Sequence, residues 1–156
     1  MTAHEETVAV VGTGDMGSAV GGALVRAGYR VVTAGDGRSA PSRKLAADAG
    51  IEDVGSLEAA VSEARLVLSI VPPAAATTFA AEVVGAMRAT GARPVFADCN
   101  AVAPETVVAI ARAVEPTLPA VAGSTRMTVT FARFGNAPNV RTGSGCFSCG
   151  FLIAQG

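Results

Sequence analysis

Three glycines near the amino terminus constrain the fold of this chain more than any other feature. Gly12, Gly14 and Gly17 form the pattern G-x-G-x-x-G. A short apolar run comes directly before them, and apolar residues at helical spacing follow until Gly28. A second apolar stretch, residues 31–33, completes a unit of about 30 residues. The order predicts strand, glycine turn, helix and strand, which is the order that a dinucleotide site requires.

Each glycine of this pattern has a physical role in such a site. Gly12 allows a tight turn, Gly14 lets the backbone approach a pyrophosphate, and Gly17 lets the helix pack closely on the strand. The free N–H groups at the helix start, together with the positive end of the helix dipole, then face the phosphates. The alternative is a glycine-rich turn between strand and helix that binds nothing.

The alternation of strands and helices continues along the chain. Strands that are apolar throughout, separated by helices, indicate a parallel sheet buried on both faces, so we predict an α/β fold of the doubly wound Rossmann type. Ligands of such sheets lie outside the carboxyl ends of the strands, which places residues 12, 35, 71 and 100 around one crevice. The expected helices are 43–49, one from Ser56, 74–90 and 105–114, and the expected strands are 8–11, 31–33, 66–71 and 94–97, with a short strand or extended turn over 51–54.

Composition narrows the classes of partner. The chain has 156 residues, half of them apolar, and a net charge of −1. An apolar share of one half is enough for the core of one domain. The balanced charge gives no electrostatic reason to bind nucleic acid or an anionic membrane. The start MTAHEET is polar, and no apolar run approaches the roughly 20 residues of a membrane span. With three cysteines and no secretory signal, we expect a cytoplasmic protein.

The sequence changes character after Glu115. All 13 acidic residues lie at or before this position, whereas four of the six phenylalanines lie beyond it. We therefore expect a dinucleotide-binding domain over 1–115 and a short irregular tail over 116–156. Cys146 and Cys149 form a C-x-x-C in that tail, but the few other candidate ligands give no reason to expect a metal site.

The residues after the second strand bear on the choice of cofactor. The usual tip position falls on Gly35, and Arg38 and Ser39 lie just beyond it. A basic residue there pairs with the 2′-phosphate of NADP, whereas an acid accepts hydrogen bonds from the ribose hydroxyls of NAD. We therefore favour NADP, with NAD possible through Asp36. In the alternative interpretation Arg38 is a solvated cation and Asp36 caps a turn.

Two further strand ends contribute candidate residues. Val71 and Pro72 follow the third main strand, and Asn100 follows the fourth. The Asn100 amide could bond a ribose or a carboxamide of the cofactor, or it could form an Asx turn before the last helix.

Three segments together resemble the cofactor domain of the β-hydroxyacid dehydrogenases, the family of 6-phosphogluconate and 3-hydroxyisobutyrate dehydrogenases. They are GTGDMG, LVLSIVPPAAA and DCNAVAPET, and the resemblance covers residues 7–115. It implies that Arg38 meets the 2′-phosphate, that Val71 and Pro72 border the adenosine, and that Asn100 lies by the nicotinamide ribose. The residues that it places around the pyrophosphate are Gly12, Thr13, Gly14, Asp15, Met16 and Gly17.

The chain departs from the family in its second part. Members of the family continue into a substrate loop, a helix with a catalytic lysine and a helical second domain. The only lysine here is Lys44, and residues 121–127 are a faint echo of the substrate loop. We expect the NADP(H)-binding domain of an oxidoreductase that transfers hydride between nicotinamide and a small hydroxyacid, without a catalytic residue of its own and inactive alone. The alternatives are a dinucleotide-binding module without chemistry and a truncated or frame-shifted product without function.

Overall fold

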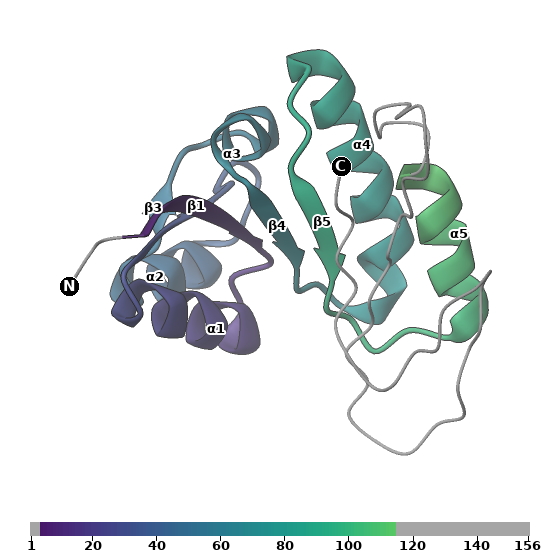
Figure 1. Cartoon of the computed structure of the whole chain (residues 1–156). Coiled ribbons are helices and arrows are strands. Elements are labelled where there is room, and N and C mark those ends of the chain that lie inside the picture. The colour runs from purple at the N-terminus through teal and green to yellow at the C-terminus, as the bar shows by residue number, and fades with distance from the viewer. Residues whose placement is uncertain (1–3, 115–156) are drawn as a thin grey trace.

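Five parallel strands form a single sheet in the computed structural model, which describes residues 4–114 (Figure 1). The strand order is β3-β2-β1-β4-β5, so the chain builds one half of the sheet and then crosses over β1 to build the other. The strands are β1 (His4–Val11), β2 (Tyr29–Thr33), β3 (Glu52–Asp53), β4 (Leu66–Ser69) and β5 (Val95–Asp98). The helices are α1 (Asp15–Arg26), α2 (Ala40–Asp48), α3 (Leu57–Glu63), α4 (Ala76–Thr90) after a 3-10 turn over Pro73–Ala75, and α5 (Pro104–Val114).

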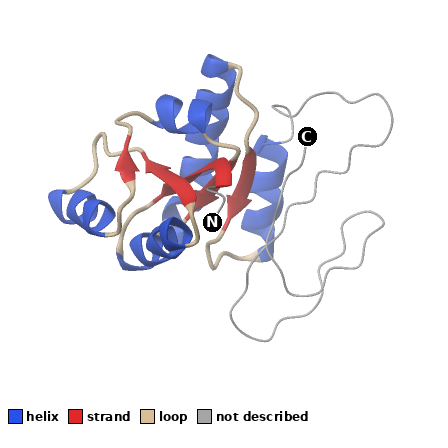
Figure 2. Ribbon diagram, turned by 60° about the vertical axis from the view of Figure 1, so that its left-hand side comes forward, coloured by secondary structure: helices blue, strands red, loops and turns tan. Residues whose placement is uncertain are grey.

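Helices cover both faces of the sheet (Figure 2). On one face, Val8 and Val10 of β1 pack with residues of α1 and α2. On the other, Ala9 and Val11 pack with residues of α3, α4 and α5. Successive side chains of a strand point to opposite faces, so a strand covered on both sides is apolar at every position. This confirms the predicted doubly wound Rossmann-type fold.

Several predicted boundaries differ from those of the structure: β1 begins at His4 and not at Val8, and β2 begins at Tyr29 and not at Val31. Two other boundaries are set by side chains. Helix α2 begins at Ala40, three residues before the expected start, because the Ser39 hydroxyl caps it by accepting from the Ser42 N–H and Pro41 fits the first turn. Strand β4 ends at Ser69 instead of Val71, since the Val71 N–H donates to the Asn100 side chain and not to a neighbouring strand. The tail over 116–156, with Cys146 and Cys149, lies outside the described residues.

No helix among residues 4–114 is long and apolar enough to cross a membrane.

The core also encloses polar groups at the carboxyl ends of β4 and β5. Asp98 is 1% exposed, and Ser69 and Asn100 are buried beside it. Asp98 Oδ1 accepts a hydrogen bond from Asn100 Nδ2, whereas Oδ2 has no hydrogen-bond partner among the described residues. Burial disfavours the charged form, and it raises the pKa of the Asp98 carboxyl above the value of an exposed aspartate. The folded protein therefore holds the Asp98 proton more tightly than the unfolded chain does.

We expect Asp98→Asn to change how stability depends on pH. Because the pKa of Asp98 is raised by folding, its contribution to stability is complete below the unfolded pKa of about 4 and is lost as the pH rises through the folded pKa. The loss is about 1.4 kcal/mol for each unit by which folding raises the pKa. Urea unfolding between pH 4 and pH 8 should show the parent losing free energy of unfolding relative to the variant. A constant difference across this range would contradict the burial effect.

Candidate cofactor-binding site

The loop between β1 and α1 closes through backbone contacts that only glycine permits. Gly12 has a φ of +90°, and a Cβ there would lie 1.9 Å from the Ile70 carbonyl oxygen. A Cβ at Gly17 would lie 2.0 Å from the Gly12 carbonyl oxygen, but 3.8 Å from the nearest atom of Val10. The close contact of Gly17 is therefore with the glycine loop. From the sequence, this contact was expected to be with the strand. The first contact places the loop against the end of β4, and the second places the start of α1 against the loop.

Gly14 differs from its two neighbours in the pattern. A Cβ built on Gly14 meets nothing within 4 Å, and its φ of −74° suits any residue. The fold thus does not require glycine here, and the space above Gly14 is open. Gly14 is the residue before α1, whose first amide groups have no carbonyl partner within the helix. An anion approaching this backbone would meet N–H groups at the positive end of the helix dipole.

Of three other residues at this loop, one contacts the protein and two are exposed to solvent. Thr13 is buried, and its Oγ1 donates to the Ser42 carbonyl oxygen at 3.2 Å, which ties the glycine loop to α2. Asp15 is exposed in the first turn of α1. Met16 is 60% exposed and is the one large hydrophobic side chain that is exposed among the described residues. Its side chain is therefore free to cover a ligand on the loop.

The tip of β2 is held by an acid that the sequence analysis did not single out. Asp53 Oδ1 accepts from the N–H of Gly35 and from the N–H of Gly55, both at 2.9 Å. A Cβ on Gly35 would lie 1.9 Å from Asp53 Oδ2, so the carboxylate occupies the space of a side chain at the tip. The Asp36 N–H donates to the Gly55 carbonyl oxygen. The loop that leads to Arg38 is therefore fastened to the end of β3.

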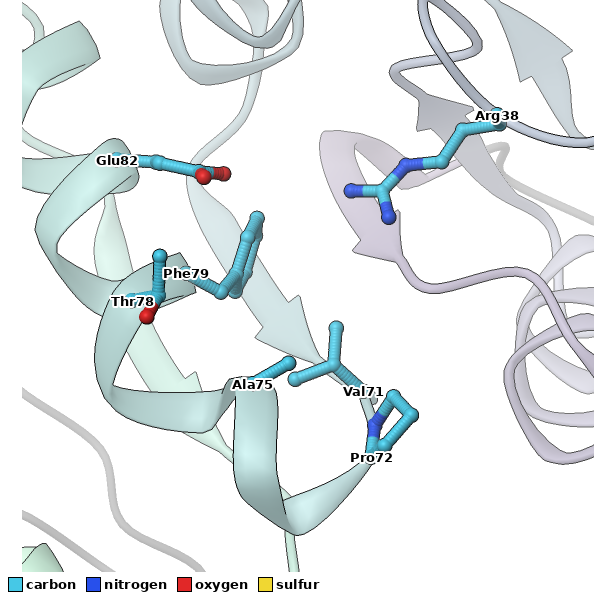
Figure 3. Close-up of a pocket in the computed structure, with 7 residues that line it drawn as sticks. All are labelled: Arg38, Val71, Pro72, Ala75, Thr78, Phe79 and Glu82. Carbon is cyan, nitrogen blue, oxygen red and sulfur yellow. The ribbon is translucent and has the colours of Figure 1, made fainter.

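A cavity of about 150 Å³ lies between this loop and the start of α4 (Figure 3). Arg38 extends its guanidinium toward the cavity from one side, and Phe79 and Glu82 of α4 face it from the other. Ser39, next to Arg38, uses its hydroxyl to cap α2. The residues that line the cavity are Arg38, Val71, Pro72, Ala75, Thr78, Phe79 and Glu82.

The wall of the cavity that the start of α4 forms was not predicted from the sequence. Ala75, the residue before α4, is followed by Thr78 and Phe79 three and four positions on, and Glu82 lies four and three positions after these two, so all four lie on one face of a helical stretch. The predicted helix over 74–90 starts beside Val71, and its spacing was a signal that could have found them.

Asn100 lies behind the cavity and contacts it through Val71. Its Oδ1 accepts from the Val71 N–H at 2.8 Å, and its Nδ2 donates to Ser69 Oγ at 2.9 Å and to Asp98. These bonds join the ends of β4 and β5, so the side chain forms long-range contacts in place of an Asx turn.

Burial, with a smaller effect from the Asp98 charge, raises the pKa of Cys99 to about 11 and keeps its thiol protonated at neutral pH.

The structure thus brings most of the predicted site residues to one edge of the sheet. The glycine loop, Arg38, Val71 and Pro72 surround the point where the strand order reverses, between β1 and β4. Asn100 joins them from the protein side. Over residues 4–114, no three histidine, cysteine or acidic side chains gather where they could hold a metal ion.

Comparison with known proteins agrees with this geometry. The family model for the NAD binding domain of 6-phosphogluconate dehydrogenase matches residues 7–121. No curated protein matches the chain.

Several solved structures are similar. A conserved protein of unknown function with structural similarity to 3-hydroxyacid dehydrogenases is 30% identical, with a TM-score of 0.57, over 70% of this chain and 40% of that one. The 3-hydroxyisobutyrate dehydrogenase of Mycobacterium tuberculosis is 25% identical, with a TM-score of 0.59, over 73% of this chain and 38% of that one. An imine reductase of Streptomyces aurantiacus is also 25% identical, with a TM-score of 0.60, over 72% and 38%.

The chain therefore spans about two fifths of the length of these structures. The match over residues 7–121 covers most of the sequence and confirms the resemblance found in its motifs. The chain belongs to the family of NAD-binding domains represented by that of 6-phosphogluconate dehydrogenase.

Proposed function

We propose that this chain binds NADP(H) as the cofactor domain of an oxidoreductase acting on a small hydroxyacid. The observation that carries the proposal is the open backbone at Gly14, beside a loop that two other glycines hold closed. The loop lies at the reversal of strand order, where open α/β sheets bind their ligands. The similarity to a 3-hydroxyisobutyrate dehydrogenase and an imine reductase supports an oxidoreductase.

The pyrophosphate of the cofactor fits the space above Gly14. A Cβ at this position would project into that space without touching the protein. Backbone N–H groups at the start of α1 would donate to the phosphate oxygens, and the helix dipole would favour their charge. Gly12 and Gly17 act indirectly, because they allow the loop to take this shape.

The adenosine of the cofactor fits the cavity next to this loop. Val71, Pro72 and Phe79 give the cavity an apolar wall, and Arg38 is the cation that faces it. A guanidinium pairs with a phosphate through parallel charged hydrogen bonds, which is the basis for proposing NADP. Glu82 faces Arg38 across the cavity and would bring a second polar group near the base.

The bound nicotinamide would supply hydride transfer at its C4 atom. The residues of this chain bind and orient the cofactor for that step. Lys44, the only lysine, lies on α2 in an exposed ion pair with Asp48 at 2.6 Å, away from the cavity. We therefore propose cofactor binding without turnover of a hydroxyacid by this chain alone. This position of Lys44 also favours the second candidate, a dinucleotide-binding module without chemistry.

We expect Gly14→Val to abolish binding of NADPH and to leave the fold intact. The valine side chain meets no protein atom, but it fills the space proposed for the pyrophosphate. Calorimetric titration of NADPH and NADH into parent and variant measures the effect, and circular dichroism checks the fold. Gly85→Val is the matched control, since Gly85 is also open and lies outside the cavity lining. Equal affinity in parent and Gly14→Val would refute the phosphate site.

Arg38→Ala tests the choice of cofactor. Losing a charged hydrogen bond should weaken NADPH by about 1.5–3 kcal/mol, which is roughly a 10- to 150-fold rise in Kd, and change NADH little. Arg88→Ala removes the same charge from an exposed position on α4 and should have no effect. Tighter binding of NADH than of NADPH by the parent would reverse the preference and point to Asp36 or Asp53 as the reader of the ribose.

A further inference from the structure

A buried polar cluster lies directly behind the cavity wall. It consists of Ser69 at the end of β4, Asp98 at the end of β5 and Asn100 just after it. All three are at least 95% buried, so no side chain of the cluster is open to solvent. The cluster connects to the cavity at one point, the hydrogen bond from the Val71 N–H to Asn100 Oδ1.

That bond accounts for the position of Val71. The sheet pairing at this edge reaches as far as Ile70, whose N–H still donates to the Val11 carbonyl oxygen at 2.9 Å. Asn100, 29 residues away, supplies the acceptor for the next amide. On the opposite side, the Ile70 carbonyl and the Val71 side chain lie against Gly12. Residues 70 and 71 are therefore held between the glycine loop and Asn100.

The cluster also fixes which way the Asn100 amide faces. An amide has one end that donates and one that accepts, and the two ends have nearly the same shape. Asp98 Oδ1 accepts from Nδ2, and Ser69 Oγ accepts from the same nitrogen. Both donor hydrogens are thereby used, and Oδ1 is left toward the Val71 N–H.

We propose that Asn100 is a positioning residue for cofactor binding, which sets Val71 as the wall of the adenosine cavity. Asp98 and Ser69 orient the amide, and the Asn100 side chain makes no contact with the cofactor. The inference rests on the proposed function of the cavity. It replaces the predicted bond from this amide to the nicotinamide ribose with an indirect effect on the opposite half of the cofactor.

The test uses the whole chain with two ligands, NADPH and its adenosine half, 2′,5′-ADP. Asn100→Ala should weaken both about tenfold, as expected for the loss of one hydrogen bond. In Asn100→Ala, hydrogen exchange measured by NMR should be faster than in the parent at the Val71 amide, and this increase should be larger than any at the β1 amides. Val61→Ala is the control for lost stability, because Val61 is fully buried on α3 and lies outside the cavity lining. It should keep both affinities.

A second pair of variants keeps the test decisive if Asn100→Ala does not fold. Asp98→Asn retains an acceptor for Asn100 Nδ2 and should keep the affinity for 2′,5′-ADP, whereas Asp98→Leu removes the acceptor and should lower it. A loss that appears with NADPH but not with 2′,5′-ADP would show direct contact with the nicotinamide half and overturn the proposal. So would unchanged affinity in folded Asn100→Ala and Asp98→Leu. If the parent binds neither ligand, the proposed function fails and this inference fails with it.

Discussion

The site depends on a backbone contact that leaves no room for a side chain. Gly12 lies so close to the Ile70 carbonyl oxygen that a Cβ would overlap it, and Gly17 lies equally close to the Gly12 carbonyl oxygen. These contacts bring the loop after β1 against the end of β4, and the start of α1 against that loop, at the point where the strand order reverses. The first turn of α1 then points its amide groups at the same crevice. Without the two contacts, neither the phosphate loop nor the cavity beside it would have this shape.

The α/β architecture could be predicted from the sequence because the patterns that indicate its strands and helices are local. Apolar runs at β1 and β4 are recognisable alone, and the glycines and prolines between elements separate one element from the next. One error occurred where a distant side chain decides the boundary. Strand β4 ends early because Asn100 takes the amide of Val71, and nothing near Val71 in the sequence reveals a partner 29 residues away. Helix α2, by contrast, starts early through a local cap at Ser39 that was present in the sequence.

The same distinction separates the predicted part of the site from the missed part. The glycine loop has a fixed spacing, so its residues could be named in advance. The carboxylate beside Gly35 belongs to Asp53, 18 residues later, and the opposite wall of the cavity belongs to α4. Both depend on how separate units pack. A glycine at the tip of β2 was visible in the sequence, but its reason was not: a neighbouring acid already fills the place of the side chain.

Several polar side chains around the site are engaged with the protein, and this favours a ligand that backbone groups can bind. Thr13 donates to the Ser42 carbonyl oxygen, Asp53 accepts from two amides, and Asn100 uses its whole amide. Each bond holds a loop in place. What faces the crevice is the backbone of the glycine loop, the end of a helix and the Arg38 guanidinium, with Glu82 as the acid among the residues that line the cavity. N–H groups and a guanidinium are donors, and a ligand rich in phosphate oxygens matches them with acceptors.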